Sequence, residues 1–149
     1  MVQVLLTLLQ ISCSRLIFPL FFLILLPMNL VQFERGIDHF NRGYFFEAHD
    51  ILEDIWRETT GPDRLFLQGL IQVSVGFYHL FNQNYKGAVS QFTKGLTKLE
   101  PYKPSHRKVE LAVFSERVLG FREQAERGLV GAVLNPDESS VPKIIYLTS

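Results

Sequence analysis

The chain of 149 residues carries fifteen acidic and fifteen basic side chains, so its formal net charge is zero when histidine is neutral. This length predicts one domain with a single hydrophobic core, and the balanced charge argues against nucleic acid as a partner. The lone cysteine, Cys13, excludes an internal disulfide, and no Cys/His spacing in the sequence resembles a zinc motif.

Residues 1–27 form an apolar leader whose only charged residue is Arg15. Its apolar run is shorter than the roughly 20 residues that cross a bilayer, and Pro19 and Pro27 interrupt it. Three interpretations stay open: a membrane anchor, a targeting segment that is removed, or a mis-assigned start upstream of Met28. A start at Met28 implies a cytoplasmic or plastid stromal protein. Otherwise the protein is membrane-associated, and a membrane is a partner only if the leader is real.

Apolar residues at helical spacing predict five helices in a domain over residues 28–130. The expected spans are Val31–Asn41, Tyr44–Arg57, Asp63–Phe81, Tyr85–Leu99 and about Arg107–Arg127. The third span has apolar residues on nearly every side, which predicts the buried central helix of a bundle. Residues 131–149 are expected to form an irregular tail, packed as an extended strip or loose.

Short turns between these spans predict antiparallel neighbours. The expected fold is therefore all-α, a compact bundle of about five helices built from two antiparallel helical hairpins plus a C-terminal helix. The sequence FNRGY at 40–44 recurs as FNQNY at 81–85, each time at a helix junction. An alternative is a tetratricopeptide-like pair of hairpins, which would leave an exposed concave groove.

Two polar stripes point to one candidate site. His49 and Glu53 share a stripe of the second predicted helix, and polar residues follow a similar stripe on the third. Antiparallel pairing would bring His49 towards His79 and Glu53 towards Gln72. The ligand-binding candidates are His49, Glu53, Gln68, Gln72 and His79.

The residue types of this cluster allow three interpretations. It is a buried hydrogen-bond network that fixes the register of the bundle, a pocket for a small polar ligand, or a metal or catalytic site. His49, Glu53 and His79 are the candidate metal ligands. The cofactor stays open, and a divalent metal is not the favoured interpretation because the His-x-x-x-Glu spacing is short and common.

Four further residues are interpreted as structural. Trp56 is expected to cover the junction of the second and third helices, and Arg57 to pair with the carboxylate one turn back or with the last carbonyl groups of its helix. Arg64 is expected to meet acidic residues of the second helix, and Gly69 to allow a close helix approach. The histidines expected at the surface are His39 and His106.

The motif FNxGxxFEAHDxLExxW over residues 40–56 resembles the signature of the bacterial and plastid domain-of-unknown-function 309 family. The continuation RxFLQGLIQ at 64–72 also resembles it, and the likeness spans about Phe33 to Tyr102. The resemblance implies a compact helical bundle but no activity, and the apolar leader departs from the family pattern. The motif positions that it marks are His49, Glu53, Trp56, Gln68, Gly69, Gln72 and His79.

Together these observations predict a binding or interaction module with a buried His/Glu/Gln cluster that takes a small polar ligand or a protein partner. One alternative is a metal-dependent enzyme or metal-binding protein that uses His49, Glu53 and His79. Another is a membrane-tethered helical-hairpin scaffold. The sequence leaves open whether the protein is an enzyme.

Overall fold

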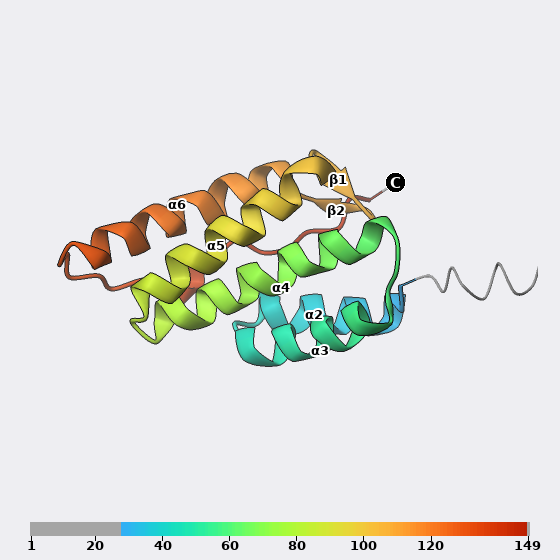
Figure 1. Cartoon of the computed structure of the whole chain (residues 1–149), viewed down its shortest axis with the longest axis horizontal. Coiled ribbons are helices and arrows are strands. Elements are labelled where there is room, and N and C mark those ends of the chain that lie inside the picture. The colour runs from blue at the N-terminus through green and yellow to red at the C-terminus, as the bar shows by residue number, and fades with distance from the viewer. Residues whose placement is uncertain (1–27, 149) are drawn as a thin grey trace, which may run out of the picture.

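The computed structural model describes residues 28–148, and this part of the chain is an all-α bundle (Figure 1). Five α-helices pack in chain order, each against the next. They are α2 (Leu30–Asn41), α3 (Phe45–Glu58), α4 (Pro62–Phe81), α5 (Tyr85–Leu99) and α6 (Ala112–Leu129). Between and after them lie the short elements η1 (Glu100–Tyr102), β1 (Ser105–His106), β2 (Val109–Glu110) and η2 (Glu138–Ser140). The predicted fold class is confirmed.

Local chemistry fixes where the helices begin. The side chain of Asn29 accepts a hydrogen bond from the amide of Gln32, and Asn84 does the same for Gly87, so two helices start with capped amide groups. Pro62 occupies the first turn of α4, where its missing N–H would have had no helical partner.

The central helix α4 packs against α3 on one side and α5 on the other. Its closest approach is to α5, where a Cβ atom added to Gly69 would lie 2.8 Å from Leu99 Cδ2 and 3.3 Å from the carbonyl oxygen of Gly95. Replacing Gly69 by a larger residue would therefore push the two helices apart. The fully buried apolar side chains of α4 are Phe66, Leu67, Leu70, Val73, Phe77 and Leu80.

Phe40 of α2 joins the first and last helices of the bundle. Its ring centroid lies 5.7 Å from that of Phe77 in α4 and 5.8 Å from that of Phe114 in α6. Since α2 and α6 meet in one core, an open tetratricopeptide-like arrangement is not formed, and that alternative is wrong.

The start of the last helix was predicted incorrectly. Residues 105–110 form a hairpin instead, in which Arg107 and Lys108 both have positive φ angles, 51° and 62°. Two successive positive φ angles are typical of the tight turns that join antiparallel strands. The Glu110 carboxylate then accepts hydrogen bonds from the amides of Val113 and Phe114, so α6 begins only at Ala112.

The C-terminal tail packs back on the bundle as an extended strip. Ile144 is buried, and the side chain of Asn41 bonds both its carbonyl oxygen and its amide. Tyr146 forms a bridge with Val109 in β2. The tail therefore connects the end of α2 to the hairpin.

None of the helices within residues 28–148 is long and apolar enough to cross a membrane. The expectation of a membrane segment is therefore not supported by any described helix. The leader, and with it the membrane-tethered alternative, lies outside the described residues.

Candidate functional site

The predicted stripes of α3 and α4 meet at a small pocket. Its volume is about 210 Å³, and its lining residues are Phe45, Phe46, His49, Val75, Tyr78 and His79. Antiparallel pairing brings the beginning of α3 to the end of α4, where the rings of Phe45 and Phe81 stack 5.7 Å apart. His49 and His79 therefore line the same pocket, one from each helix.

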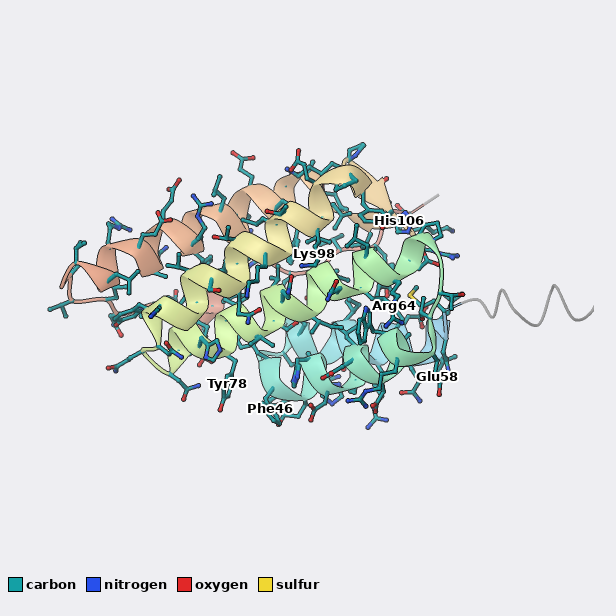
Figure 2. The ribbon with its side chains drawn as sticks, viewed as in Figure 1. Phe46, Glu58, Arg64, Tyr78, Lys98 and His106 are labelled. Atoms are coloured by element: carbon teal, nitrogen blue, oxygen red, sulfur yellow. The ribbon has the colours of Figure 1, made fainter. Side chains whose placement is uncertain are left out.

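Two exposed aromatic rings border this pocket. Phe46 is 49% exposed and Tyr78 is 40% exposed, and their ring centroids lie 5.5 Å apart. Figure 2 shows the two side chains near each other, one from α3 and one from α4. Because folding leaves this aromatic pair in water, a further apolar group that binds here removes additional apolar area from solvent.

His49 is held within α3. Its Nδ1 donates to the carbonyl oxygen of Phe46 at 3.0 Å, and its Nε2 lies 3.3 Å from Oε2 of Glu53. Asp50 adds a carboxylate oxygen 3.2 Å from Nδ1. One donor atom from each of His49, Asp50 and Glu53 lies within 4.8 Å of the others. Among the described residues, the group that could hold a metal ion therefore includes Asp50, whereas the sequence suggested His79 as the third ligand.

Glu53 is half-buried rather than buried, because its stripe lies at the edge of α3 and not on the face towards the core. Its side chain is 36% exposed and contacts His49 and, at 3.4 Å, Arg57. Arg57 also bonds Asp54 at 2.7 Å. All these partners lie on α3, so this cluster does not join separate elements of the fold.

His79 is oriented by Asn84, the residue immediately before α5. The Asn84 side-chain oxygen accepts from the Gly87 amide at 3.0 Å, so its side-chain nitrogen faces Nδ1 of His79 at 3.2 Å. Nδ1 of His79 is therefore an acceptor, and the ring proton resides on Nε2. His79 offers a hydrogen-bond donor at the pocket that His49 also lines.

Gln72 does not pair with Glu53. Its Oε1 instead accepts a hydrogen bond from Nζ of Lys98 in α5, at 3.0 Å. Gln68 lies one turn before Gln72 on the same half-exposed side of α4. The five predicted residues thus share one side of the α3–α4 pair, but only His49 and His79 line the pocket.

Arg64 contacts the end of α3 in a way that the sequence did not suggest. It donates to the carbonyl oxygens of Trp56 and Thr59, at 2.7 and 3.0 Å, rather than to an acidic side chain. Its guanidinium carbon lies 3.8 Å from the centroid of the Trp56 ring. This arrangement satisfies the last carbonyl groups of α3 and covers the indole, so it stabilises the α3–α4 junction.

A second polar cluster joins α4 to the hairpin. Nε2 of His106 donates to Asp63 Oδ1 at 2.7 Å, and Arg107 bonds both carboxylate oxygens of Asp63. The Asp63 side chain is only 10% exposed. The His106 ring packs on Phe66, with centroids 4.8 Å apart. His106 is therefore only partly exposed, and the expectation that it lies at the surface is wrong.

The charge of Asp63 is stabilised by its partners. Burial acts to raise the pKa of this carboxyl, but the hydrogen bonds from Arg107 and His106 and their charges lower it by more, so that the pKa lies below its ordinary value. The sequence could not reveal this cluster, because its members lie more than forty residues apart.

Other hollows do not contain the predicted residues. Two of about 360 and 430 Å³ lie between the beginning of α2 and the end of α3, and both are lined by Ile55 and Glu58. They are larger than the pocket at His49, and one of them brings together Arg35, Asp54 and Glu58, but neither contains a residue that the sequence predicted for ligand binding. The pocket between α3 and α4 therefore remains the best candidate site.

Comparison with known proteins finds similarity over this part of the chain. The family model described as "Domain of unknown function (DUF309)" matches residues 33–91, which include all five candidate ligand residues. The chain is also similar to the uncharacterised protein YpuF of Bacillus subtilis (strain 168), with 37% identity over 73 residues. The similar region spans 48% of this chain and 40% of YpuF, so the chain covers less than half of that relative.

Proposed function

We propose that this chain, whose residues 33–91 match the DUF309 family of domains of unknown function, is a protein-interaction module. Its pocket between α3 and α4 takes one apolar or aromatic side chain of a partner protein. The observation that carries this proposal is the exposed Phe46–Tyr78 pair beside a hollow lined mainly by apolar and aromatic groups.

The size of the pocket favours a single side chain over a larger ligand. Its volume of about 210 Å³ is below the range of about 300–1,000 Å³ that is usual for sites of drug-sized molecules and cofactors. Aromatic anchors in small pockets carry much of the binding energy at protein interfaces. His79 adds a ring N–H that can donate to a carbonyl oxygen of the partner backbone.

N-acetyl-L-phenylalaninamide is a direct probe of this proposal. We expect it to shift the amide resonances of pocket residues in the full chain at millimolar concentration, because it presents one aromatic side chain and two peptide groups. N-acetylglycinamide has the same peptide groups without the side chain and should leave these resonances unchanged. Equal shifts with both probes, or none with either, would contradict the proposal.

A variant that fills the pocket is the matched control on the protein. Val75 lines the pocket and is half-buried, so Val75→Phe places a ring in the hollow while keeping an apolar surface. Binding of the phenylalanine probe should be lost in this variant. An unchanged circular-dichroism spectrum would show that the helices persist.

A second candidate function is binding of a divalent cation by His49, Asp50 and Glu53. It is favoured by their convergence within 4.8 Å and by the bond from His49 Nδ1 to the Phe46 carbonyl, since this bond leaves Nε2 as the ligand atom. It ranks second because all three groups come from one helix and none of them is buried, and such exposed acidic groups are common without a metal ion.

Calorimetric titration with Zn²⁺ tests the second candidate. Stoichiometric binding of Zn²⁺ that Glu53→Gln weakens by at least about tenfold would support this candidate, because losing a group that holds a metal typically costs that much affinity. Absence of binding, or binding that Glu53→Gln leaves unchanged, would exclude a cation site at this cluster.

A further inference from the structure

The central helix lies between a negatively charged and a positively charged helix. α3 carries five carboxylates and one arginine, whereas α5 carries three lysines and no acidic residue. From Leu65 to Phe81, α4 contains no Asp, Glu, Lys or Arg. In Figure 2, α4 runs between α3 and α5, and Lys98 lies on the α5 side.

Side chains of opposite charge, one from α5 and one from α3, lie on either side of the middle of α4. On one side Lys98 extends across to α4, where it bonds Gln72. On the other, Phe46 pairs with Tyr78, so Glu53, two turns later on α3, lies level with Gln72, about two turns earlier on α4. We call the surface that contains Glu53, Gln72 and Lys98 the α3–α4–α5 face.

This face begins at the pocket. The Phe46–Tyr78 pair lies at one end of α3 and α4, and Glu53 on α3 and Lys98 on α5 lie further along the two neighbouring helices. The half-exposed residues between the flanks come from α4 and include Gln68, Gln72 and Val75. An occupant therefore meets an apolar anchor site at one end, a neutral strip along the centre, and charges of opposite sign on the two edges.

We infer that the partner segment is an amphipathic α-helix that lies along the α3–α4–α5 face, with basic side chains over α3 and acidic side chains over α5. This inference rests on the proposed function, because the same segment supplies the side chain that enters the pocket. Charge complementarity supports this occupant, because Glu53 faces one flank of the partner and Lys98 faces the other.

The geometry of the occupant follows from the three-part pattern of the face. An extended strand directs its side chains to two opposite sides, one towards the surface and one away from it. A helix with one apolar stripe also carries side chains on both flanks of that stripe, as the partner helices of coiled coils do. Only the helix presents an apolar anchor to the pocket, uncharged groups to the strip, and basic and acidic groups to the two edges at once.

Two synthetic peptides of about five helical turns test this inference. Both have one leucine stripe with a phenylalanine near one end, and both contain the same numbers of arginine and glutamate residues. In the segregated peptide all arginines lie on one flank and all glutamates on the other, whereas each flank of the mixed peptide carries both. Exchanging the flanks would be a poor control, because a helix turned end to end would restore the match.

Binding of each labelled peptide to the full chain is measured by fluorescence anisotropy. We expect the segregated peptide to bind about tenfold more tightly than the mixed peptide at low salt, and the advantage to shrink as salt is added. Equal affinity for the two peptides, or no binding of either, would overturn the inference.

Charge reversals locate the effect on the face. Lys98→Glu should remove most of the advantage of the segregated peptide. Lys86→Glu makes the same change on the same helix, but its position twelve residues earlier lies about a third of a turn around the axis, so it should have little effect. On α3, Glu53→Lys and Glu47→Lys form a corresponding pair. Equal effects within each pair would show that net charge, and not this face, governs binding.

The inference and the proposed function fail in different ways. If Val75→Phe abolishes peptide binding while the charge reversals change nothing, the pocket binds an apolar anchor and the amphipathic helix is wrong. If the phenylalanine probe does not bind but the segregated peptide retains its advantage in Val75→Phe, the charged face binds a helix without the pocket. That result would refute the anchor and leave the charge-matched helix standing.

Discussion

The molecule contains the same three chemical groups, an imidazole, a carboxylate and a guanidinium, in two regions with different consequences. Beginning at the pocket, which His49 lines, His49, Glu53 and Arg57 follow one another at four-residue steps along α3, and the carboxylate is 36% exposed. At the hairpin, Asp63 in α4 bonds His106 and Arg107, more than forty residues away, and its side chain is only 10% exposed. The first cluster stays within one helix, whereas the second joins α4 to the hairpin.

This difference separates stability from binding. A contact between neighbours on one helix constrains little that the helix has not already ordered, and exposed ion pairs contribute about 0–1 kcal/mol. A buried carboxylate with partners from a distant segment holds two elements together, and its partners are left unsatisfied when it is removed. The hairpin cluster is therefore expected to stabilise the fold, and the pocket cluster to remain available to a ligand.

Removing the buried carboxylate should have the largest effect. We expect Asp63→Asn to lower the free energy of unfolding by about 2 kcal/mol, because Arg107 loses its bidentate partner and His106 loses its charged acceptor. Urea denaturation measures this loss. Asp50→Asn, at a side chain that is 57% exposed, is the matched control and should change stability little. A loss no larger than that of the control would show that the buried Asp63 stabilises the fold no more than an exposed carboxylate does.

Acid should remove the stability that the charge of Asp63 contributes. Because the folded-state pKa of Asp63 lies below its ordinary value of 3.8, its charge contributes stability that is fully present above that value. This contribution is lost as the pH falls through the folded-state pKa. Urea denaturation at a series of pH values below 5, compared with Asp63→Asn, should show a steeper decline in the wild-type chain. Parallel curves would assign the acid sensitivity to other carboxylates.

How much of this comparison the sequence reveals depends on the separation of the partners. The stripe of His49 and Glu53 is visible because helical spacing alone brings residues four apart together. The helices themselves follow from the same periodicity, and α2 to α5 begin and end within one or two residues of the predicted spans. The sequence did not predict the bonds of Asp63 with the hairpin or the bond of Gln72 with Lys98, because these partners are far apart in the chain.

The sequence of the hairpin contains few of the residues that mark a tight turn. Residues 105–110 lack the glycine or asparagine that marks most tight turns, and Arg107 and Lys108 adopt positive φ angles in spite of their side chains. The bonds of Arg107 to Asp63 help to hold this conformation. Pro62 and Asp63 suggested only the beginning of a helix, so neither half of the cluster predicted the other.

A smaller effect is expected at the pocket cluster. Glu53→Gln should lower the free energy of unfolding by less than about 1 kcal/mol, because both partners of Glu53 lie on α3 and its carboxylate is partly in water. The same urea titration measures it. A loss equal to that of Asp63→Asn would mean that the pocket cluster also holds the fold.

The smallest effect concerns the tail near the hairpin. Burial, with a contribution from the charge of Glu34, raises the pKa of Tyr146 from 10.0 to about 12. The neutral phenol therefore contributes stability below pH 10, and this is lost as the pH rises towards 12. In an ultraviolet titration, Tyr146→Phe should remove the tyrosinate signal that appears last. Removal of an earlier signal would show that the tail is not packed on Phe33 and Val109 in solution.

The most direct test of the central claim is the free energy of unfolding of the double variant His49→Gln, Glu53→Gln, measured in urea beside Asp63→Asn. We expect the double variant to lose less than about 1 kcal/mol, and less than Asp63→Asn, because its contacts stay within α3. A loss as large as that of Asp63→Asn would show that contacts within one helix stabilise this fold as much as contacts between distant segments. The cluster at the pocket would then be part of the framework of the bundle.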